Sequence, residues 1–370
     1  MALTEAQQFL LGRVGSRAKF SVANKTDIPK ILLIRLGGVD NLLAASPFFD
    51  QLRKHFPHSE IILVVGRSSC PLVEHNPHIN RLILVDDCFL YQGGWLGRVV
   101  EYFRLVCKLR KEEFDLSFVL HRAWPFRLLS CLVGVPVRVG FGCGRKDFFL
   151  THSAFTDQSI NESESYLDLL RKMNISAVFK KTYYYLSDEE KDFQGLFLER
   201  HAITGKDKVI AVAPGGVSNA RSKMTTGHWP VQNYIELINR LQSEGPSRII
   251  LVGRPDDRKA TSFIVQSCQN CLDATDLSFG EMASVFRGCS LFIGNDSIYN
   301  HIAVAMGIPY IRMFCPTDSR PWFSFTSIND ATVASLKPSA SIVQNFSMYS
   351  NAEFPIAVSV DEVWQHLKTS

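Results

Sequence analysis

The sequence has no apolar run long enough to cross a membrane. A spanning helix needs about 18–20 consecutive apolar residues, and no segment of the 370-residue chain reaches that length. The first twenty residues, MALTEAQQFLLGRVGSRAKF, also lack the apolar core of a secretory signal peptide. These absences predict a cytoplasmic protein.

Paired cysteine spacing and a strong net charge are missing as well. The nine cysteines are scattered, and the one CxxC, at Cys268 and Cys271, has no second pair or histidine at zinc-ligand spacing. This pattern is typical of free thiols in a reducing compartment, so we expect neither a metal nor another cofactor. The net charge of +4 is too small to indicate a nucleic-acid partner.

Two common nucleotide-binding motifs are absent from the turns that follow the apolar runs. Neither glycine turn, at 37–38 or at 215–216, belongs to a GxGxxG, which disfavours a nicotinamide-dependent dehydrogenase. The second turn is not followed by GK[ST], so it is not a P-loop.

Apolar, β-rich runs alternate with helix-length segments along most of the chain. This alternation is typical of parallel sheets covered by helices. In the first half, strands are predicted at 31–36, 60–65, 81–86, 115–120 and 137–141, and helices at about 42–55 and 96–112. In the second half, strands are predicted at 209–214, 248–253, 290–295 and 310–314, and helices at 231–242, 258–269 and from Ser297.

Two such series predict an α/β protein with two Rossmann-like domains. Asp40, Gly215 and Asp296 each follow a predicted strand, and ligands of such sheets bind beyond the carboxyl ends of the strands. We therefore expect all three to face one cleft between the domains. The expected parts are an extension at 1–28, a first domain at 29–186, a second domain at 187–345, and a segment at 346–370 that packs back toward the first domain.

The segment LFIGNDSIYNHIAVAMGIP, 291–309, predicts a strand followed by a capped helix. Asp296 or Ser297 can cap the helix, whose first N–H groups, around Ser297 and Ile298, form a site for phosphate oxygens. His301 lies one turn further and shares the face of Asp296. The alternative is an ordinary capped helix with a packed histidine.

The segment VIAVAPGGVSNARSKMTTGHWP, 209–230, leads from a strand into a glycine turn. Gly215 and Gly216 let a ligand approach the backbone, and Arg221 and Lys223 can neutralise a diphosphate without a metal ion. The alternative is a solvated basic loop. Trp229 is either a packing wall near the nucleotide or a buried anchor of the next helix.

Two further segments carry candidate binding residues. In LVGRPDD, 251–257, Asp257 can accept hydrogen bonds from ribose hydroxyls, although turn residues of this type are common. His121, Arg122 and Arg127 follow a strand of the first domain and can hold an anionic acceptor. Solvated charge beside a buried segment is the alternative for these three.

In this order, the segments resemble the lipopolysaccharide heptosyltransferases of glycosyltransferase family 9. The resemblance runs from about Ile31 to Phe325. It rests on GNDSIYNHIAVAMGIP with FCPTDSRPW, on APGG…HWP with RIILVG, and on FDLSFVLHR…LVGVPVRVGF.

The resemblance implies a glycosyltransferase of GT-B architecture, with two Rossmann-like domains. It further implies inverting, metal-independent transfer of a sugar, with ADP-heptose the usual donor and a lipopolysaccharide core or related glycan the acceptor. The nucleotide-sugar would bind mainly to the second domain, and the acceptor to the first. Gly215, Gly216, Arg221, Lys223, Trp229, Asp257, Asp296, Ser297, Ile298 and His301 are then the donor-binding candidates.

The turn RLGGVDN, 35–41, departs from the Gly-Asp that the family usually has there. Asp40 stands at the usual glycine position and Asn41 at the usual aspartate position. A carboxylate can take a proton from a hydroxyl nucleophile and an amide cannot, so Asp40 is the candidate catalytic base. Asn41 joins the acceptor-binding candidates.

Two alternatives follow from this departure. Asp40 can be no more than the cap of the following helix, with the base missing. The chain would then be a non-catalytic relative that binds a nucleotide-sugar.

Two basic segments suggest contact with a membrane surface. Leu3–Phe20 has the pattern of a short basic amphipathic helix, although such extensions are more often packed or frayed ends. The basic helix from Arg98 to Lys111 is a second candidate surface. Because the family's acceptors are lipid-linked, we expect peripheral contact with the inner face of the inner membrane.

Overall fold

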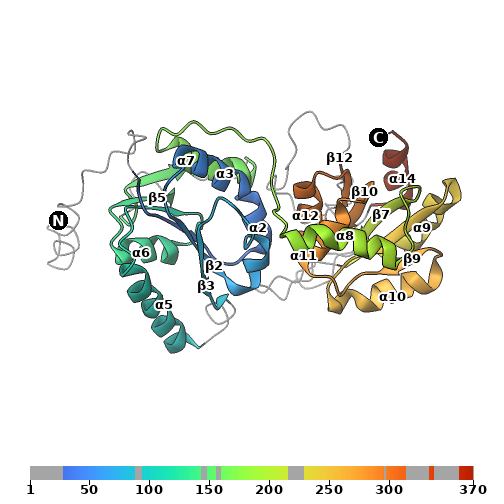
Figure 1. The fold of residues 1–370 in the computed structure, drawn as a ribbon, viewed down its shortest axis with the longest axis horizontal. Coiled ribbons are helices and arrows are strands. Elements are labelled where there is room, and N and C mark those ends of the chain that lie inside the picture. Colours follow the sequence, from blue (N-terminus) through green and yellow to red (C-terminus); the bar gives the residue numbers. More distant parts are fainter. Residues whose placement is uncertain are drawn as a thin grey trace, which may run out of the picture. The chain divides into compact units, whose positions relative to one another are not determined.

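The computed structural model describes residues 28–87, 94–142, 148–155, 160–215, 229–295, 297–313, 333–336 and 358–369. These residues form two compact α/β units (Figure 1). The described residues up to Lys180, apart from 71–75, make the first unit. Residues 71–75 and the described residues from Lys181 onward make the second.

The first unit is built on a six-stranded parallel sheet with the order β3-β2-β1-β4-β5-β6. Continuous apolar runs form its centre because strands covered on both faces have no side exposed to water. Every residue of β1 and β2 is buried. The strands are β1 (Ile31–Arg35), β2 (Ile61–Gly66), β3 (Arg81–Val85), β4 (Leu116–Val119), β5 (Val137–Gly142) and β6 (His152–Phe155).

Helices cover both faces of this sheet, and successive strand residues point to opposite faces. Leu32 and Ile34 of β1 share a core cluster with Leu109 of α5. Phe118 of β4 instead packs edge to face on Phe48 of α3. The helices are α2 (Val39–Ala44), α3 (Ser46–His55), α5 (Trp95–Arg110), α6 (Trp124–Val133) and α7 (Glu162–Arg171). A 3₁₀ helix, η1 (Arg67–Leu72), begins in this unit, and its last two residues belong to the second unit.

The second unit repeats this plan with a parallel sheet of order β12-β11-β10-β7-β8-β9. Its strands are β7 (Lys208–Ala213), β8 (Ser247–Leu251), β9 (Cys271–Asp273), β10 (Leu291–Asn295), β11 (Tyr310–Met313) and β12 (Val333–Leu336). Its helices are α8 (Asp188–Arg200), α9 (Val231–Glu244), η2 (Pro255–Asp257), α10 (Arg258–Ser267), α11 (Phe279–Phe286), α12 (Ile298–Met306) and α14 (Val360–Thr369).

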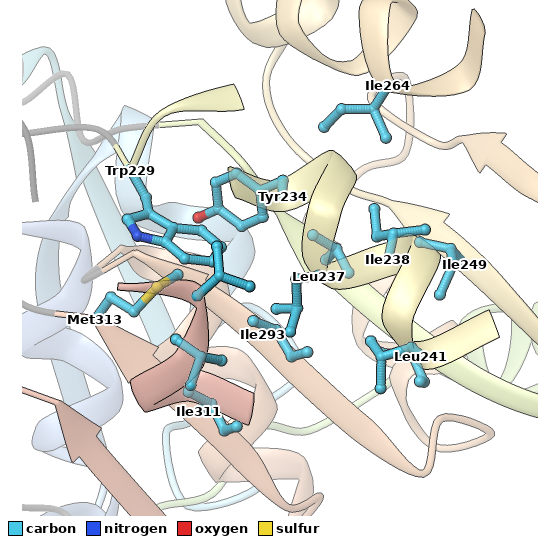
Figure 2. Packing of buried hydrophobic residues seen from close by; sticks show 14 of the residues in the cluster. Trp229, Tyr234, Leu237, Ile238, Leu241, Ile249, Ile264, Ile293, Ile311 and Met313 are labelled. Atoms are coloured by element: carbon cyan, nitrogen blue, oxygen red, sulfur yellow. The ribbon is translucent and has the colours of Figure 1, made fainter. Parts of the chain in front are cut away.

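One core cluster of the second unit joins α9 to the sheet and to the C-terminal helix. Figure 2 shows the Trp229 indole beside Tyr234, with Met313 and Ile311 of β11 close by. Val363 of α14 belongs to the same cluster and is fully buried. The described part of the last segment, 358–369, therefore packs within the second unit, whereas the sequence predicted a return of 346–370 to the first domain. The helix α14 lies beside α9 and β12.

Among the described residues, no helix combines the length and the apolar character that a membrane span requires.

Candidate functional site

The carboxyl edge of the second sheet brings together the ends of three neighbouring strands, β7, β8 and β10. The side chain of Asn295, the last residue of β10, forms hydrogen bonds with several groups at this edge. Its side-chain amide donates hydrogen bonds to the carbonyls of Gly215, at 3.0 Å, and of Pro214, at 3.3 Å. Its side-chain oxygen accepts a bond of 2.9 Å from the Tyr234 hydroxyl. The buried amide thus fixes the turn after β7 against the end of β10.

Asp257 approaches the same turn from η2. Its carboxylate accepts a hydrogen bond of 2.8 Å from the Arg254 backbone N–H. A Cβ added to Gly215 would lie 2.2 Å from the Asp257 Cγ, and one added to Gly253 would lie 3.0 Å from the Asp257 Cβ. A side chain at 215 would therefore displace the Asp257 carboxylate from its present position.

Tyr299, in the first turn of α12, lies close enough to Asp257 and Arg254 for their charges to affect its phenol. Burial raises the pKa of its phenol, the negative charge of Asp257 raises it further, and the positive charge of Arg254 opposes the rise. Three strand-end segments thus contribute side chains to one patch at the sheet edge.

The helix α12 presents its N-terminus at this edge. Ser297 occupies the N-cap position with extended backbone, but its side chain makes no capping hydrogen bond. The Ser297 Oγ is buried and makes no hydrogen bond within the described part of the chain. The first N–H groups of a helix have no partner inside the helix, so together with this hydroxyl they offer donors to an anion.

His301 lies one turn into α12 and is buried. Burial lowers its pKa well below the ordinary value, and the positive charge of Arg312 adds to the effect. Arg312 comes from β11, is fully buried, and donates at 3.5 Å to Asn300 Oδ1. A neutral, buried imidazole fits the packed-histidine alternative better than a cation that faces phosphate.

Trp229 has no exposed surface, and its indole N–H donates a hydrogen bond of 2.6 Å to the Val358 carbonyl. It also packs edge to face on Tyr234, with ring centroids 4.7 Å apart. A wall for a nucleotide would need an exposed ring face. The structure therefore favours the other alternative, a buried anchor at the start of α9.

Four predicted donor-binding residues lie outside the described residues: Gly216, Arg221, Lys223 and Asp296. Their roles stay predictions. Conversely, sequence reasoning missed Asn295, Tyr234, Tyr299 and Arg254. The signal for Asn295 was available, because an amide at the end of an otherwise apolar strand needs hydrogen-bond partners when it is buried.

In the first unit, the turn after β1 is made by Gly37 and Gly38, whose φ angles of 65° and 69° are left-handed. Gly38 is the N-cap residue of α2, which begins at Val39. A Cβ at Gly38 would lie 2.5 Å from the Asn41 Nδ2 and 3.1 Å from the Arg35 Nη2. The sequence therefore needs glycine here both for backbone conformation and for space.

Asp40 stands second in α2 rather than at its cap. The alternative that Asp40 caps this helix is therefore wrong, because the N-cap position belongs to Gly38. The placement of the Asp40 side chain lies outside the description, so its role as base stays a prediction.

The three acceptor-binding candidates around α6 make contacts inside the first unit. Arg122 Nη1 binds both carboxylate oxygens of Glu162, at 2.9 and 2.6 Å, and its guanidinium lies over the Phe141 ring. Arg127 is buried and donates at 3.0 Å to the Phe141 carbonyl. His121 is buried too, and its Nδ1 accepts at 3.0 Å from the Ala123 N–H.

The alternative of solvated charge is thus wrong for His121 and Arg127, which stabilise the first unit from inside. Arg122 keeps 27% of its side chain exposed and is the one of the three with surface left for a ligand. Among the described residues, no group of three or more His, Cys, Asp or Glu side chains could hold a metal ion.

Comparison with known proteins settles the family. The model of glycosyltransferase family 9 (heptosyltransferase) matches residues 102–350. The chain belongs to this family. It is accordingly assigned to the glycosyltransferases, with a two-domain α/β fold of the GT-B type.

This family 9 chain is 25% identical to lipopolysaccharide heptosyltransferase 3 of Escherichia coli over 295 residues, which are 76% of the chain and 83% of that protein. It is 22% identical to lipopolysaccharide heptosyltransferase 2 of Escherichia coli strain K12 over 312 residues, which cover 78% and 83% of the two proteins.

Solved structures of family 9 members share the fold. A family 9 glycosyltransferase from Veillonella parvula superposes with a TM-score of 0.76 at 20% identity, covering 94% of this chain and 99% of that one. The E. coli heptosyltransferase WaaC with ADP-2-deoxy-2-fluoro heptose superposes with a TM-score of 0.69 at 15% identity, covering 92% and 99%.

Proposed function

We propose that this chain transfers a heptose from ADP-heptose to a lipopolysaccharide core or a related glycan. Family membership supports the reaction class, and the named activities of the two E. coli relatives support the sugar and the acceptor. The observation that carries the proposal is the convergence of Gly215, Asp257 and Ser297 at one sheet edge.

The donor diphosphate would bind at the N-terminus of α12. The Ser297 hydroxyl and the first N–H groups of the helix supply donors, and the positive end of the helix dipole favours an anion. Gly215 has no Cβ, so the Asp257 carboxylate can lie directly against its backbone at the edge of this site. Arg221 and Lys223 would balance the charge that develops on the leaving diphosphate, without a metal ion.

The nucleoside and the sugar would be held by carboxylates. Asp257 is positioned by the Arg254 N–H, and a carboxylate at this place can accept hydrogen bonds from ribose hydroxyls. Asp296 would accept hydrogen bonds from hydroxyls of the transferred sugar.

Transfer would proceed with inversion at the anomeric carbon. The acceptor hydroxyl oxygen forms the new bond to that carbon, the bond to the diphosphate oxygen breaks, and the hydroxyl proton passes to the Asp40 carboxylate. A base of this kind contributes about 10²–10⁴-fold to the rate. Asn41 and Arg122 would contact the acceptor.

Calorimetric titration with ADP, UDP and GDP tests the donor part of the proposal. We expect ADP to bind most tightly and Asp257→Asn to weaken ADP and UDP alike, because the ribose is common to both. Asp276→Asn, the same change at an exposed acid of the same unit, is the control. A preference for UDP or GDP in the wild type would contradict ADP-heptose as the donor.

The non-catalytic alternative has its own test. If nucleotide release from bound ADP-sugar on addition of core acceptor is the same for wild type and Asp40→Ala, the chain binds without transferring through Asp40.

A further inference from the structure

The helix α5 has a second apolar face that no described element covers. Its first face packs in the core through Leu105, Val106 and Leu109. The second is formed by exposed side chains that recur at intervals of three and four and so share one side of the helix. These side chains are Leu96, Val99, Val100, Phe103 and Cys107.

The exposure of this second face is large for a soluble protein. Leu96 is 62% exposed, Phe103 52% and Val100 49%, and Trp95 at the start of the helix is 67% exposed. An open groove runs along this side and is lined by Val99, Val100, Phe103, Arg104, Cys107, Lys108 and Lys111. An apolar stripe of this kind marks a surface that binds something.

Basic side chains border the stripe. Within 95–111 the sequence has five basic residues and one acidic residue, Glu101. Arg104, Lys108 and Lys111 line the same groove as Phe103. Glu101 is 3.3 Å from Arg104, so it offsets one of the positive charges at most.

We propose that this face of α5, defined by Leu96, Val99, Val100, Phe103 and Cys107, lies on an anionic lipid surface. An exposed apolar stripe bordered by cations is the pattern of a helix that binds in the plane of a bilayer interface. The apolar side chains enter the boundary between headgroups and acyl chains, and the cations bind the negative headgroups.

Charge argues against two other occupants. A second copy of the chain would bring the same cations against this stripe. Residues 1–27 carry four basic and two acidic residues, so their net charge has the same sign as that of α5. An anionic surface is the partner whose charge is complementary.

Sedimentation of the full-length protein with vesicles tests the proposal. One set contains phosphatidylcholine alone, and the other contains one third phosphatidylglycerol. We expect binding to the anionic vesicles only, weakened about fivefold for each cation removed in Arg104→Gln/Lys108→Gln. The charge-matched control is Lys172→Gln/Lys180→Gln, a change of two exposed lysines elsewhere in the first unit.

The apolar contribution is tested by Phe103→Glu, which should reduce binding tenfold or more. Phe263→Glu is the matched control, because Phe263 is a helix residue of similar exposure, 47%, on α10 of the second unit. Vesicles should also protect Cys107 from a water-soluble maleimide, as read by peptide mass spectrometry.

Three results would overturn the proposal. One is equal binding to both sets of vesicles. Another is an equal effect of Phe103→Glu and Phe263→Glu. The third is a change of oligomeric state in Phe103→Glu, measured by light scattering, while vesicle binding is unchanged, because a second copy would then cover the stripe.

Discussion

The side-chain amide of Asn295 donates a hydrogen bond of 3.0 Å to the Gly215 carbonyl. This bond joins the ends of β10 and β7, two neighbours in the second sheet. Because Asp257 lies directly against Gly215, the bond also fixes the position of the turn relative to that carboxylate. The donor site we propose depends on this arrangement.

Gly215→Ala should disturb the donor site by forcing the Asp257 carboxylate away. The new Cβ would lie 2.2 Å from the Asp257 Cγ, and overpacking of this kind costs about 1–3 kcal/mol. We expect ADP affinity to fall about tenfold or more, measured by calorimetry. Gly205→Ala is the control, because a Cβ at this exposed glycine meets nothing within 4 Å. Equal affinities of the two variants would contradict the role of the Gly215 turn.

Asn295→Leu should destabilise the second unit more than Tyr234→Phe. The leucine removes the donor to the carbonyls of Pro214 and Gly215 and leaves the Tyr234 hydroxyl only its longer bond, of 3.3 Å, to the Ala213 carbonyl. Each buried polar group left unsatisfied costs about 1–3 kcal/mol. Tyr234→Phe removes one hydroxyl and should cost about 1 kcal/mol. Urea unfolding of both variants and of the double variant measures the coupling. Additive effects would show that the two side chains do not act together.

The stability of the protein should fall below about pH 6.5 in part because of His301. Burial and the charge of Arg312 lower its pKa in the folded chain, whereas an unfolded histidine has a pKa of about 6.5. As the pH falls through that value, the unfolded chain binds a proton that the folded chain does not, so the folded state loses stability.

Comparison with His301→Gln isolates this contribution. Between pH 7.5 and 5.5, the free energy of unfolding of the wild type should fall by about 1 kcal/mol more than that of the variant. The quantity to compare is the change in the free energy of unfolding between pH 7.5 and 5.5, because the variant can be less stable than the wild type at both pH values. Parallel pH profiles would mean that folding does not lower the pKa of His301.

The central strands could be predicted from the sequence because they are continuous apolar runs. β1, β2, β7, β8 and β10 lie within one or two residues of their predicted positions. The strands β6 and β9 were not predicted. Each has only three or four residues and lies at one edge of its sheet, and neither forms a continuous apolar run.

The helix predicted at 42–55 is two helices in the structure, and it starts earlier. α2 begins at Val39 because two left-handed glycines complete the turn before it. α3 begins at Ser46 with Pro47 in its first turn, where the missing N–H of proline costs nothing. The proline would break the hydrogen bonds of one continuous helix at this point.

The candidate site was predictable only in part. Glycine, acid and cap residues at strand ends identified Gly215, Asp257 and Ser297, since strand ends meet at one edge of a parallel sheet. Tyr234 and Tyr299 could not be predicted as site residues, because their position at the sheet edge depends on how α9 and α12 pack on the sheet. The same reason explains why Trp229, His121 and Arg127 turned out to be buried.

The most direct test of the proposed transfer reaction is the rate of sugar transfer to core acceptor in Asp40→Asn. The amide keeps the shape of the side chain and cannot accept the proton. We predict a fall in kcat of about 10²–10⁴-fold with ADP affinity unchanged, and no comparable fall in Asp50→Asn, a partly buried acid of the adjacent helix α3. An unchanged kcat in Asp40→Asn would contradict Asp40 as the base.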